Sequence, residues 1–369
     1  MTGSGELFVG VMSGTSADGI DAVLADFSSP RPRFVHGVSS DYPDAIRKAA
    51  LTLNAPGADE LDRAAKLAVA LADLYAAAVI DLLRQAGVPT ANVRAIGCHG
   101  QTVRHRPDAG FTIQLVNGAQ LAERCGIDVV TDFRSRDVAA GGQGAPLVPA
   151  FHEAMFRHPT THRAVVNIGG IANITDLPPA NVDDQVRGFD TGPGNCLLDL
   201  WAARHTGARF DQDGHLAAIG RIDADLLARM LAEPYFSMRP PKSTGRDLFD
   251  EQWIARHLTP RLAAADVQST LVELTAKTIA DAIRTACRDA REVFVCGGGV
   301  HNPVLMSRLA ASLPTATVTS TAVAGVDPRW VEAYAFAWLA RRTVRREPGN
   351  IAAVTGAAGP RILGALYAK

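Results

Sequence analysis

The chain has 369 residues, of which 47% are hydrophobic and 20% are charged, and this composition is ordinary for a globular protein. Its length is sufficient for two domains that each bury a substantial core. The formal net charge is −1 and the chain contains no long basic run, which argues against nucleic acid or an anionic membrane as its main partner.

The cysteines and the N-terminal segment bear on the cellular compartment. The five cysteines are odd in number and show no Cys-x-x-Cys spacing, which argues against a disulfide framework or structural zinc and favours a reducing compartment. The first residues do not form a basic segment followed by a sustained apolar run, and no apolar run approaches the length of a membrane span. We therefore expect a soluble cytoplasmic protein.

The first predicted element is a β-hairpin. Apolar runs at 7–9 and 20–27 flank Gly10–Asp21, a turn rich in glycine and hydroxyl groups. Glycine lets the backbone approach a ligand closely, and consecutive N–H groups in such a turn form a concave anion site. The alternative is an ordinary polar turn. The turn is not a Walker loop or a dinucleotide fingerprint, because a strand rather than a helix follows it.

The remainder of the first half alternates helices and strands. The predicted elements are a strand at 33–39, a helix at 59–85, a buried strand at 95–98, a strand at 111–115, a helix at 118–125 and a strand at 127–130. A long irregular segment follows at 131–149, and such segments tend to be functional. We therefore expect one domain at 1–131 and a second at 132–369, with the boundary between 131 and 160.

The second half repeats the opening pattern. A strand at 163–168, a turn at Gly169–Gly170 and a strand at 172–177 resemble the first hairpin, which indicates two related β-sheet domains facing each other across a cleft. The other predicted elements are helices at 195–205, 223–232, 247–257, 266–289 and 328–345, and a strand at 293–296 that leads into Gly297–Gly299. Both halves therefore predict an α/β fold.

Two further stretches have both a functional and a structural interpretation. Asp190 lies among small residues in Gly188–Asn195, immediately before a predicted helix, so it either carries chemistry or lies on a turn that caps the helix. The charged turns 132–134 and 242–247 are either part of a site or ordinary solvated loops. The residues alone leave both questions open.

Three glycine-rich elements occur in a fixed order, at Gly10–Asp21, Asn167–Ile174 and Cys296–Asn302. They resemble the first phosphate, second phosphate and adenosine elements of the sugar kinase, Hsp70 and actin superfamily. Together with His99-Gly-Gln-Thr and Gly188–Asn195, they more closely resemble the anhydro-N-acetylmuramic acid kinase family, from about residue 8 to the last helix. This resemblance implies two actin-like, ribonuclease H-like α/β domains that flank a central ATP cleft.

The resemblance also implies an activity. It is the ATP-dependent, hydrolytic opening of 1,6-anhydro-N-acetylmuramic acid to N-acetylmuramic acid 6-phosphate in peptidoglycan recycling, with ATP and Mg²⁺ as cofactors. The implied partners are ATP, the anhydrosugar and water, and a second copy of the chain in a homodimer. The alternatives are a kinase for another sugar and a nucleotide-gated binding or chaperone module, which would need a peptide-binding appendage.

The resemblance assigns roles to individual residues. Asp190 falls on the catalytic base. The implied nucleotide-binding residues are Gly14, Thr15, Ser16, Ala17, Asp18, Gly19, Ile20, Asp21, Asn167, Gly169, Gly170, Gly297, Gly298 and Gly299. The expected sugar-binding residues are His99, Gln101, Thr102, Arg134 and Glu332. Of these, Arg134 is expected to pair with the lactyl carboxylate, because a guanidinium matches a carboxylate with two hydrogen bonds.

The chain departs from the superfamily at two acidic positions. The acids usually found in the two phosphate hairpins fall at Met12 and Asn167, and neither residue is a carboxylate. The Mg²⁺ ligands therefore stay open among Asp18, Asp21 and Asp190, which we expect to act through water because Mg²⁺ retains much of its hydration.

Overall fold

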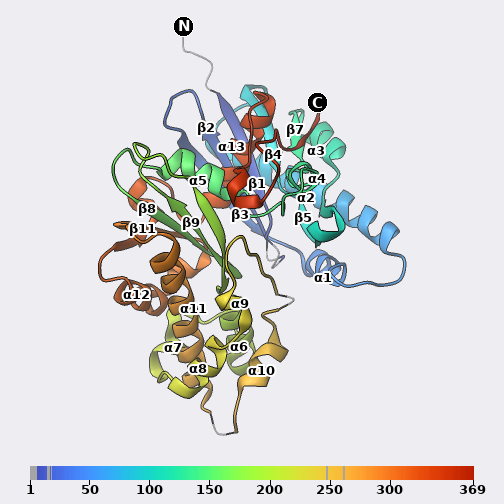
Figure 1. Cartoon of the computed structure of the whole chain (residues 1–369). Helices are drawn as coiled ribbons and strands as arrows, with labels where there is room; N and C mark the ends of the chain where they lie inside the picture. Colours follow the sequence, from blue (N-terminus) through green and yellow to red (C-terminus); the bar gives the residue numbers. More distant parts are fainter. Residues whose placement is uncertain (1–5, 15–16, 18, 247, 261) are drawn as a thin grey trace. The chain divides into compact units, whose positions relative to one another are not determined.

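A computed structural model describes residues 6–369 except 15, 16, 18, 247 and 261 (Figure 1). The contacts divide the chain into two compact units, one of Met1–Phe151 with Trp330–Lys369 and one of His152–Arg329. The break after Phe151 lies inside the expected range, but the C-terminal segment returns to the first unit. The expected assignment of all of 132–369 to a second domain therefore needs correction.

The first unit is built on a six-stranded sheet in the order β13-β7-β4-β1-β2-β3. Its strands are β1 (Leu7–Met12), β2 (Gly19–Asp26), β3 (Arg33–Asp41), β4 (Val93–Cys98), β7 (Val129–Thr131) and β13 (Ala365–Tyr367). β1 and β2 pair antiparallel, as the hairpin prediction requires, whereas β1 and β4 pair parallel. A separate two-stranded sheet joins β5 (Gln101–Arg106) to β6 (Phe111–Leu115).

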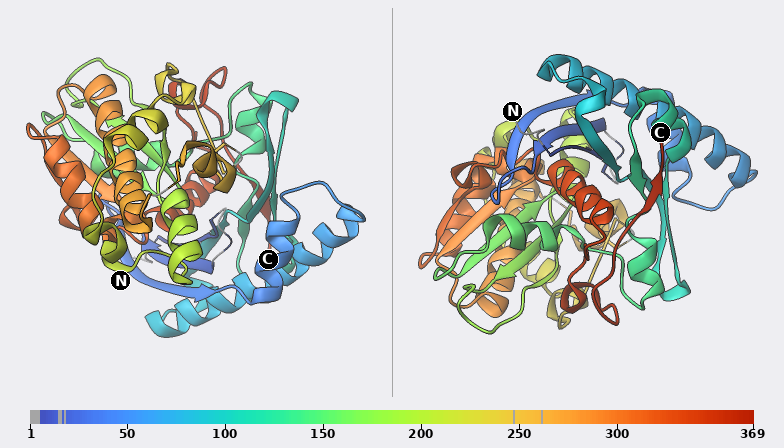
Figure 2. Two further views of the ribbon diagram at one scale, coloured as in Figure 1. Left: turned by 90° about the horizontal axis from the view of Figure 1, so that it is seen from below. Right: turned by 90° about the horizontal axis from the view of Figure 1, so that it is seen from above.

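The helices of the first unit cover both faces of this sheet. They are α1 (Asp44–Thr52), α2 (Glu60–Ala86), α3 (Gly118–Cys125), α4 (Ser135–Ala139), α13 (Val331–Val344) and α14 (Ala352–Thr355), and α5 (Val148–Phe156) crosses the break between the units. Alternate residues of a strand face opposite sides. Val9 and Val11 accordingly join the core cluster that holds Leu71 of α2, while Gly10 faces α13. In the right-hand view of Figure 2, α2 (light blue to cyan) and α13 (red) lie on opposite sides of the blue strands.

Gly10 and Gly97 are required by this helix packing. A Cβ added at Gly10 would overlap the Ala333 carbonyl oxygen, and one at Gly97 would overlap the Phe336 carbonyl oxygen. The two glycines therefore let α13 lie directly on β1 and β4. The role of Gly10 is to admit a helix that lies more than three hundred residues later in the chain, in addition to opening the predicted turn.

The second unit repeats the strand arrangement of the first. Its sheet has the order β10-β9-β8-β11-β12, with β8 (Arg163–Ile168), β9 (Ile171–Leu177), β10 (Arg187–Pro193), β11 (Glu292–Cys296) and β12 (Thr317–Ser320). In both units three antiparallel strands are followed by two parallel ones, which is the ribonuclease H-like topology. The expected α/β fold and the expected likeness of the two halves are confirmed.

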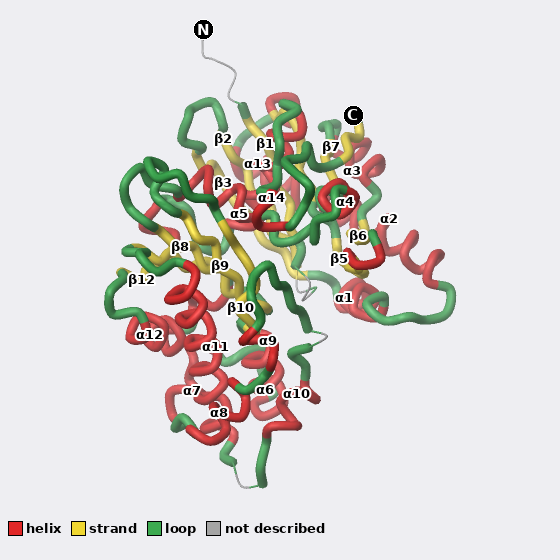
Figure 3. The backbone as a smooth tube through the Cα atoms, in the orientation of Figure 1, coloured by secondary structure: helices red, strands yellow, loops and turns green. Residues whose placement is uncertain are grey.

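Most helices of the second unit gather at one end of its sheet (Figure 3). They are α6 (Cys196–Thr206), α7 (His215–Ile219), α8 (Ala224–Leu231), α9 (Pro234–Ser237), α10 (Glu251–His257), α11 (Ala264–Ala286) and α12 (Pro303–Ser312). Short 3₁₀ turns occur at Thr90–Asn92, Pro107–Ala109, Gln212–Gly214, Gly298–His301 and Thr321–Ala324. Over the described residues, none of the helices has the length and apolar character needed to cross a membrane.

Candidate active site

Buried side chains form a hydrogen-bond network with the start of the turn that follows β1. The Ser13 hydroxyl lies 2.7 Å from the Tyr75 hydroxyl and donates to the Gly100 carbonyl at 3.0 Å. The Gln101 side-chain amide donates to the Gly14 carbonyl at 3.1 Å, and its oxygen accepts from the Tyr42 hydroxyl at 3.3 Å. The start of the turn is therefore fixed. Of the predicted nucleotide-binding residues, Thr15, Ser16 and Asp18 lie outside the described residues.

His99 connects this turn to Arg134. The Arg134 guanidinium donates to His99 Nε2 from both Nε, at 3.1 Å, and Nη2, at 2.9 Å. Because arginine can only donate, the imidazole hydrogen resides on Nδ1, which donates to the Ser13 carbonyl at 3.3 Å. Burial, with a further contribution from Arg134, lowers the pKa of His99 to about 3. His99 is therefore neutral at physiological pH.

Gln101 and Thr102 of the His-Gly-Gln-Thr stretch lie on β5. Gln101 is only 1% exposed, and its amide makes the two bonds described above. The Thr102 hydroxyl accepts from Gln114 on β6 at 3.3 Å. The structure thus brings His99 and Gln101 together beneath the Ser13–Gly14 turn, whereas their expected contact with a sugar stays a prediction.

Arg134 is itself held by a buried carboxylate acting through one glycine. Its Nη1 donates to the Gly144 carbonyl at 2.8 Å, and the N–H of Gly144 donates to Asp137 Oδ2 at 2.8 Å. Asp137 is fully buried and also accepts from Asn350 at 2.6 Å and Thr355 at 2.7 Å. We call Asp137, Gly144, Asn350 and Thr355 the Asp137 cluster. It ties α4 and the loop that follows it to the C-terminal part of the chain.

Asp190 lies in the second unit, on β10 opposite Asn173 of β9. Its N–H donates to the Lys242 carbonyl at 3.3 Å, its carbonyl accepts from the Tyr235 hydroxyl at 2.7 Å, and its Oδ2 accepts from the N–H of Thr244 at 3.1 Å. The helix that follows, α6, has Asn195 as its N-cap. The helix-cap interpretation of Asp190 is therefore wrong.

The segment 242–246 packs against Asp190 and is not a freely solvated loop. Lys242 and Thr244 make the contacts just described, and the Arg246 guanidinium lies beside Gly170, where an added Cβ would be 3.5 Å from Nη2. Sequence reasoning did not assign these residues. The available signal was the Ser-Thr-Gly order at 243–245, which resembles the hydroxyl and glycine content of the first turn.

The predicted nucleotide residues of the second unit come together at the ends of two parallel strands. β11 pairs with β8 so that Cys296 lies opposite Asn167. Gly297 has a φ of +80°, and a Cβ there would overlap the Asn167 side chain. The carbonyls of Gly169 and Gly170 accept hydrogen bonds of 2.8–3.0 Å from the N–H groups of residues 194–196, at the start of α6. The stretches 167–170 and 297–299 are therefore neighbours, and their expected binding of phosphate and adenosine stays a prediction.

Two further predicted residues, Glu332 and Asp21, lie in the first unit. Glu332 lies in the first turn of α13, within the first unit. Asp21 accepts a hydrogen bond from Ser39 on the neighbouring strand β3. Across the described residues, no three His, Cys, Asp or Glu side chains gather into a metal-binding group. The expected water-mediated contacts of Asp21 and Asp190 with Mg²⁺ stay a prediction.

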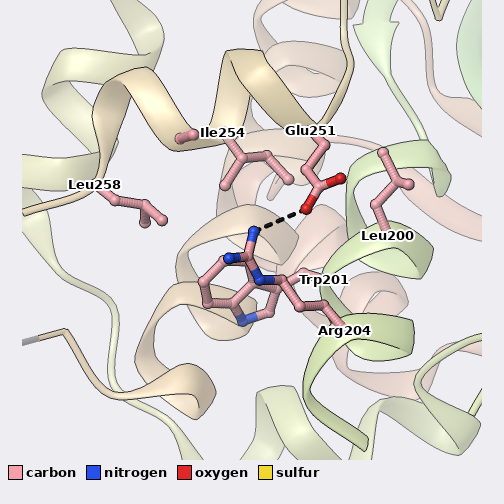
Figure 4. A pocket seen from close by; sticks show the side chains of 7 residues that line it. Leu200, Trp201, Arg204, Glu251, Ile254 and Leu258 are labelled. Atoms are coloured by element: carbon pink, nitrogen blue, oxygen red, sulfur yellow. Dashed lines mark hydrogen bonds and ion pairs between the residues drawn. The ribbon is translucent and has the colours of Figure 1, made fainter. Parts of the chain in front are cut away.

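The lining of one small cavity includes none of these residues. It has a volume of about 10 Å³, and its lining includes Trp201, Ile254 and Leu258 (Figure 4). Arg204 and Glu251 form an ion pair at its rim at 2.8 Å. A cavity of this size holds roughly one water molecule, so it is not a nucleotide or sugar site.

The whole described chain matches known proteins. A family model described as anhydro-N-acetylmuramic acid kinase covers residues 6–369. The protein of that name from Thiobacillus denitrificans is 54% identical, with 99% of this chain and 98% of that protein aligned. Its counterpart from Nitrosomonas europaea is 53% identical, with 98% and 99% aligned.

Among solved structures, a ROK family glucokinase from Streptomyces griseus in complex with glucose and AMPPNP aligns with 16% identity and a TM-score of 0.41, over 91% of this chain and 99% of that one. The family match and the alignments with relatives of 53–54% identity extend over essentially the full chain. The chain therefore belongs to the anhydro-N-acetylmuramic acid kinase family.

Proposed function

We propose that this chain is an ATP-dependent kinase that opens 1,6-anhydro-N-acetylmuramic acid with water and phosphorylates O6. The products are N-acetylmuramic acid 6-phosphate and ADP, in the recycling of cell-wall peptidoglycan. The observation that carries this proposal is family membership over residues 6–369, with relatives of about half identity that bear this name.

The chemistry explains why one carboxylate is sufficient. The 1,6-anhydro bridge occupies O6, so water attacks C1 while the C1–O6 bond breaks and O6 forms a bond to the γ-phosphorus of ATP. Asp190 accepts the proton of the attacking water as general base. The departing O6 is captured by phosphorus as ADP leaves, so it needs no separate acid. The paired carboxylates of an ordinary inverting glycosidase are therefore not required.

The contacts around Asp190 support its role as base. The bond from the N–H of Thr244 stabilises the ionised carboxylate, and the Tyr235 hydroxyl fixes the main chain that carries it. A base held in one position reacts faster, because less ordering remains to be done in the transition state.

We assign nucleotide binding to the glycine-rich turns at Gly14–Asp21, Asn167–Gly170 and Gly297–Gly299. Their N–H groups suit the phosphate oxygens, and the close packing of Gly297 on Asn167 brings two of the three elements together. Mg²⁺ supplies charge neutralisation at the transferring phosphoryl group when bound. Asp21 and Asp190 are the described acids that would hold its water shell.

We assign Arg134 to the lactyl carboxylate of the sugar, with Thr102 and Glu332 as further contacts. His99 and Gln101 support that site, because their polar atoms already bind Arg134 and the Ser13–Gly14 turn.

We place the reaction in the cytoplasm and expect a homodimer. Light scattering on the purified protein tests the dimer, and a monomeric mass would contradict it.

The test of this function is product identification. Purified protein is incubated with ATP, Mg²⁺ and 1,6-anhydro-N-acetylmuramic acid, and the sugar product is weighed by mass spectrometry. The proposal requires a gain of one phosphoryl group and one water molecule per sugar. A phosphorylated sugar that retains the anhydro bridge, or ADP release without sugar phosphate, would contradict it.

A further inference from the structure

The segment after β7 contains a glycine-rich loop, 140–144, that the reaction as written above does not use. Gly144 lies in this loop with a φ of +67°, which glycine adopts readily. Its N–H donates to Asp137 Oδ2 and its carbonyl accepts from Arg134 Nη1, each at 2.8 Å. Gly144 is therefore held on both sides, by the buried carboxylate on one and by the guanidinium on the other.

The loop also packs closely on α4, which carries Asp137. The N–H of Gly142 donates to the Asp137 carbonyl at 2.9 Å, and a Cβ added at Gly142 would overlap Asp137 Oδ2. A Cβ at Gly144 would lie 2.8 Å from the Val138 side chain, closer than carbon atoms pack. The two glycines therefore let the loop lie directly against Asp137.

The C-terminal segment binds the same loop and the same carboxylate. The N–H of Gln143 donates to the Thr355 carbonyl at 2.7 Å. The side chains of Asn350 and Thr355 donate to Asp137 Oδ1 at 2.6 and 2.7 Å. Together with the N–H of the loop at Oδ2, three donors surround Asp137, which acts towards them only as an acceptor, as a carboxylate does.

We propose that Asp137 is a positioning residue that sets the preference for a sugar bearing a carboxylate, because it holds Gly144 and thereby the Arg134 guanidinium in one orientation. This inference rests on the proposed function, in which Arg134 pairs with the lactyl carboxylate. A guanidinium makes two hydrogen bonds to a carboxylate only when the two planar groups are aligned. Displacement of Gly144 therefore weakens this pair selectively, whereas a purely structural Asp137 would affect all sugars alike.

The decisive variant is Asp137→Asn, which keeps the size of the side chain. When its oxygen accepts from Asn350 and Thr355, its amide nitrogen faces the N–H of Gly144, donor against donor. We expect the ratio of kcat/KM for 1,6-anhydro-N-acetylmuramic acid to kcat/KM for 1,6-anhydro-N-acetylglucosamine to fall about tenfold. The kcat/KM for the second sugar should change less than about twofold. An unchanged ratio in the folded variant would overturn the inference.

A double variant shows whether Asp137 acts through Arg134. In Arg134→Ala there is no guanidinium left to orient, so adding Asp137→Asn should leave the ratio where Arg134→Ala alone puts it. A further fall of about tenfold in the double variant would show that Asp137 acts independently of Arg134, and would overturn the inference.

The matched control is Asp211→Asn, in the second unit. Asp211 also accepts three hydrogen bonds, from the N–H groups of Leu216 and Ala217 at 2.8 and 3.0 Å and from the Gln268 amide at 3.3 Å. This variant should lose stability in urea titrations but keep the wild-type ratio. An equal fall of the ratio in Asp211→Asn would show that the ratio follows stability, and would overturn the inference.

Circular dichroism confirms that each variant is folded. If Asp137→Asn does not fold, Thr355→Val decides, because it removes one donor from the carboxylate. The ratio should then fall about threefold, whereas Thr355→Ser should keep it, and equal ratios in these two variants would overturn the inference. Equal losses for both sugars in Arg134→Ala would overturn it as well. Failure of the proposed function is distinct, because the wild type would then form no N-acetylmuramic acid 6-phosphate.

Discussion

At the scale of single residues, Asp190 is the proposed general base. Asp190→Asn retains an oxygen that accepts from the N–H of Thr244 but cannot take a proton near neutral pH. We expect turnover to fall by roughly 10²–10⁴, the usual contribution of a general base. Binding of ATP and sugar, measured by calorimetry, should largely survive, because the loss belongs to the transition state.

The matched control for this substitution is Asp223→Asn. Asp223 caps α8 by accepting from the N–H of Leu226 at 2.7 Å, and asparagine caps a helix about as well as aspartate. This variant should therefore retain wild-type turnover. Equal turnover in the two variants would remove Asp190 from the role of base.

A substitution of Arg134 tests its proposed role in recognising the sugar. Arg134→Ala should weaken binding of the muramic substrate by about 1.5–3 kcal/mol, which is the usual contribution of a charge-assisted hydrogen bond. The control substrate is 1,6-anhydro-N-acetylglucosamine, which lacks the lactyl acid. Its binding should weaken much less. Steady-state kinetics with both sugars measure the difference. Equal losses would show that Arg134 acts only through His99 and the loop.

At the scale of elements, local pattern predicted the strands and turns that follow each other directly in the chain. The two glycine-rich hairpins and β6 lie where expected. No strand was predicted around Asp190, which lies on β10, because its strand character depends on pairing with β9. The loop at 242–246 could not be assigned, since its contact with Asp190 joins positions about fifty residues apart.

The Asp137 cluster is an element-scale feature that can be tested by stability. Thr355→Val keeps the side-chain shape but removes a hydrogen-bond donor from a fully buried carboxylate. We expect the free energy of unfolding to fall by about 1–3 kcal/mol in urea titrations. Thr355→Ser retains the hydroxyl and should lose less. A valine variant as stable as the serine variant would show that the hydroxyl contributes nothing.

At the scale of the whole molecule, the duplicated topology was predictable and the path of the chain was not. The repeated strand-turn-strand pattern indicated two related sheets, and the five strands of the second match five of the first, which adds β13 at its edge. The return of Trp330–Lys369 to the first unit was missed, because it depends on α13 packing onto β1 and β4. Gly10 and Gly97 make that packing possible, but sequence alone suggested only a ligand role for Gly10.

Each unit also contains one buried neutral histidine, which affects stability. Burial lowers the pKa of His99 and of His152 to about 3. In the unfolded chain both take up a proton below about pH 6.5. The unfolded state therefore binds more protons, and the free energy of unfolding should fall between about pH 6.5 and 3, by about 1.4 kcal/mol per pH unit for each histidine.

Urea titrations across this pH range measure the effect. His152→Gln should reduce the slope, whereas His215→Gln, at an exposed position, should not. The same slope in both variants would contradict the assignment of His152 as a neutral buried group.

In the proposed reaction, water attacks C1 while O6 moves to phosphorus. The most direct measurement is the reaction in ¹⁸O-labelled water, quenched before mutarotation exchanges the anomeric oxygen, with the label located by mass spectrometry. Water attack at C1 predicts one label on the anomeric oxygen of N-acetylmuramic acid 6-phosphate and none in its phosphate. Label in the phosphate, or an unlabelled anomeric oxygen, would contradict the account.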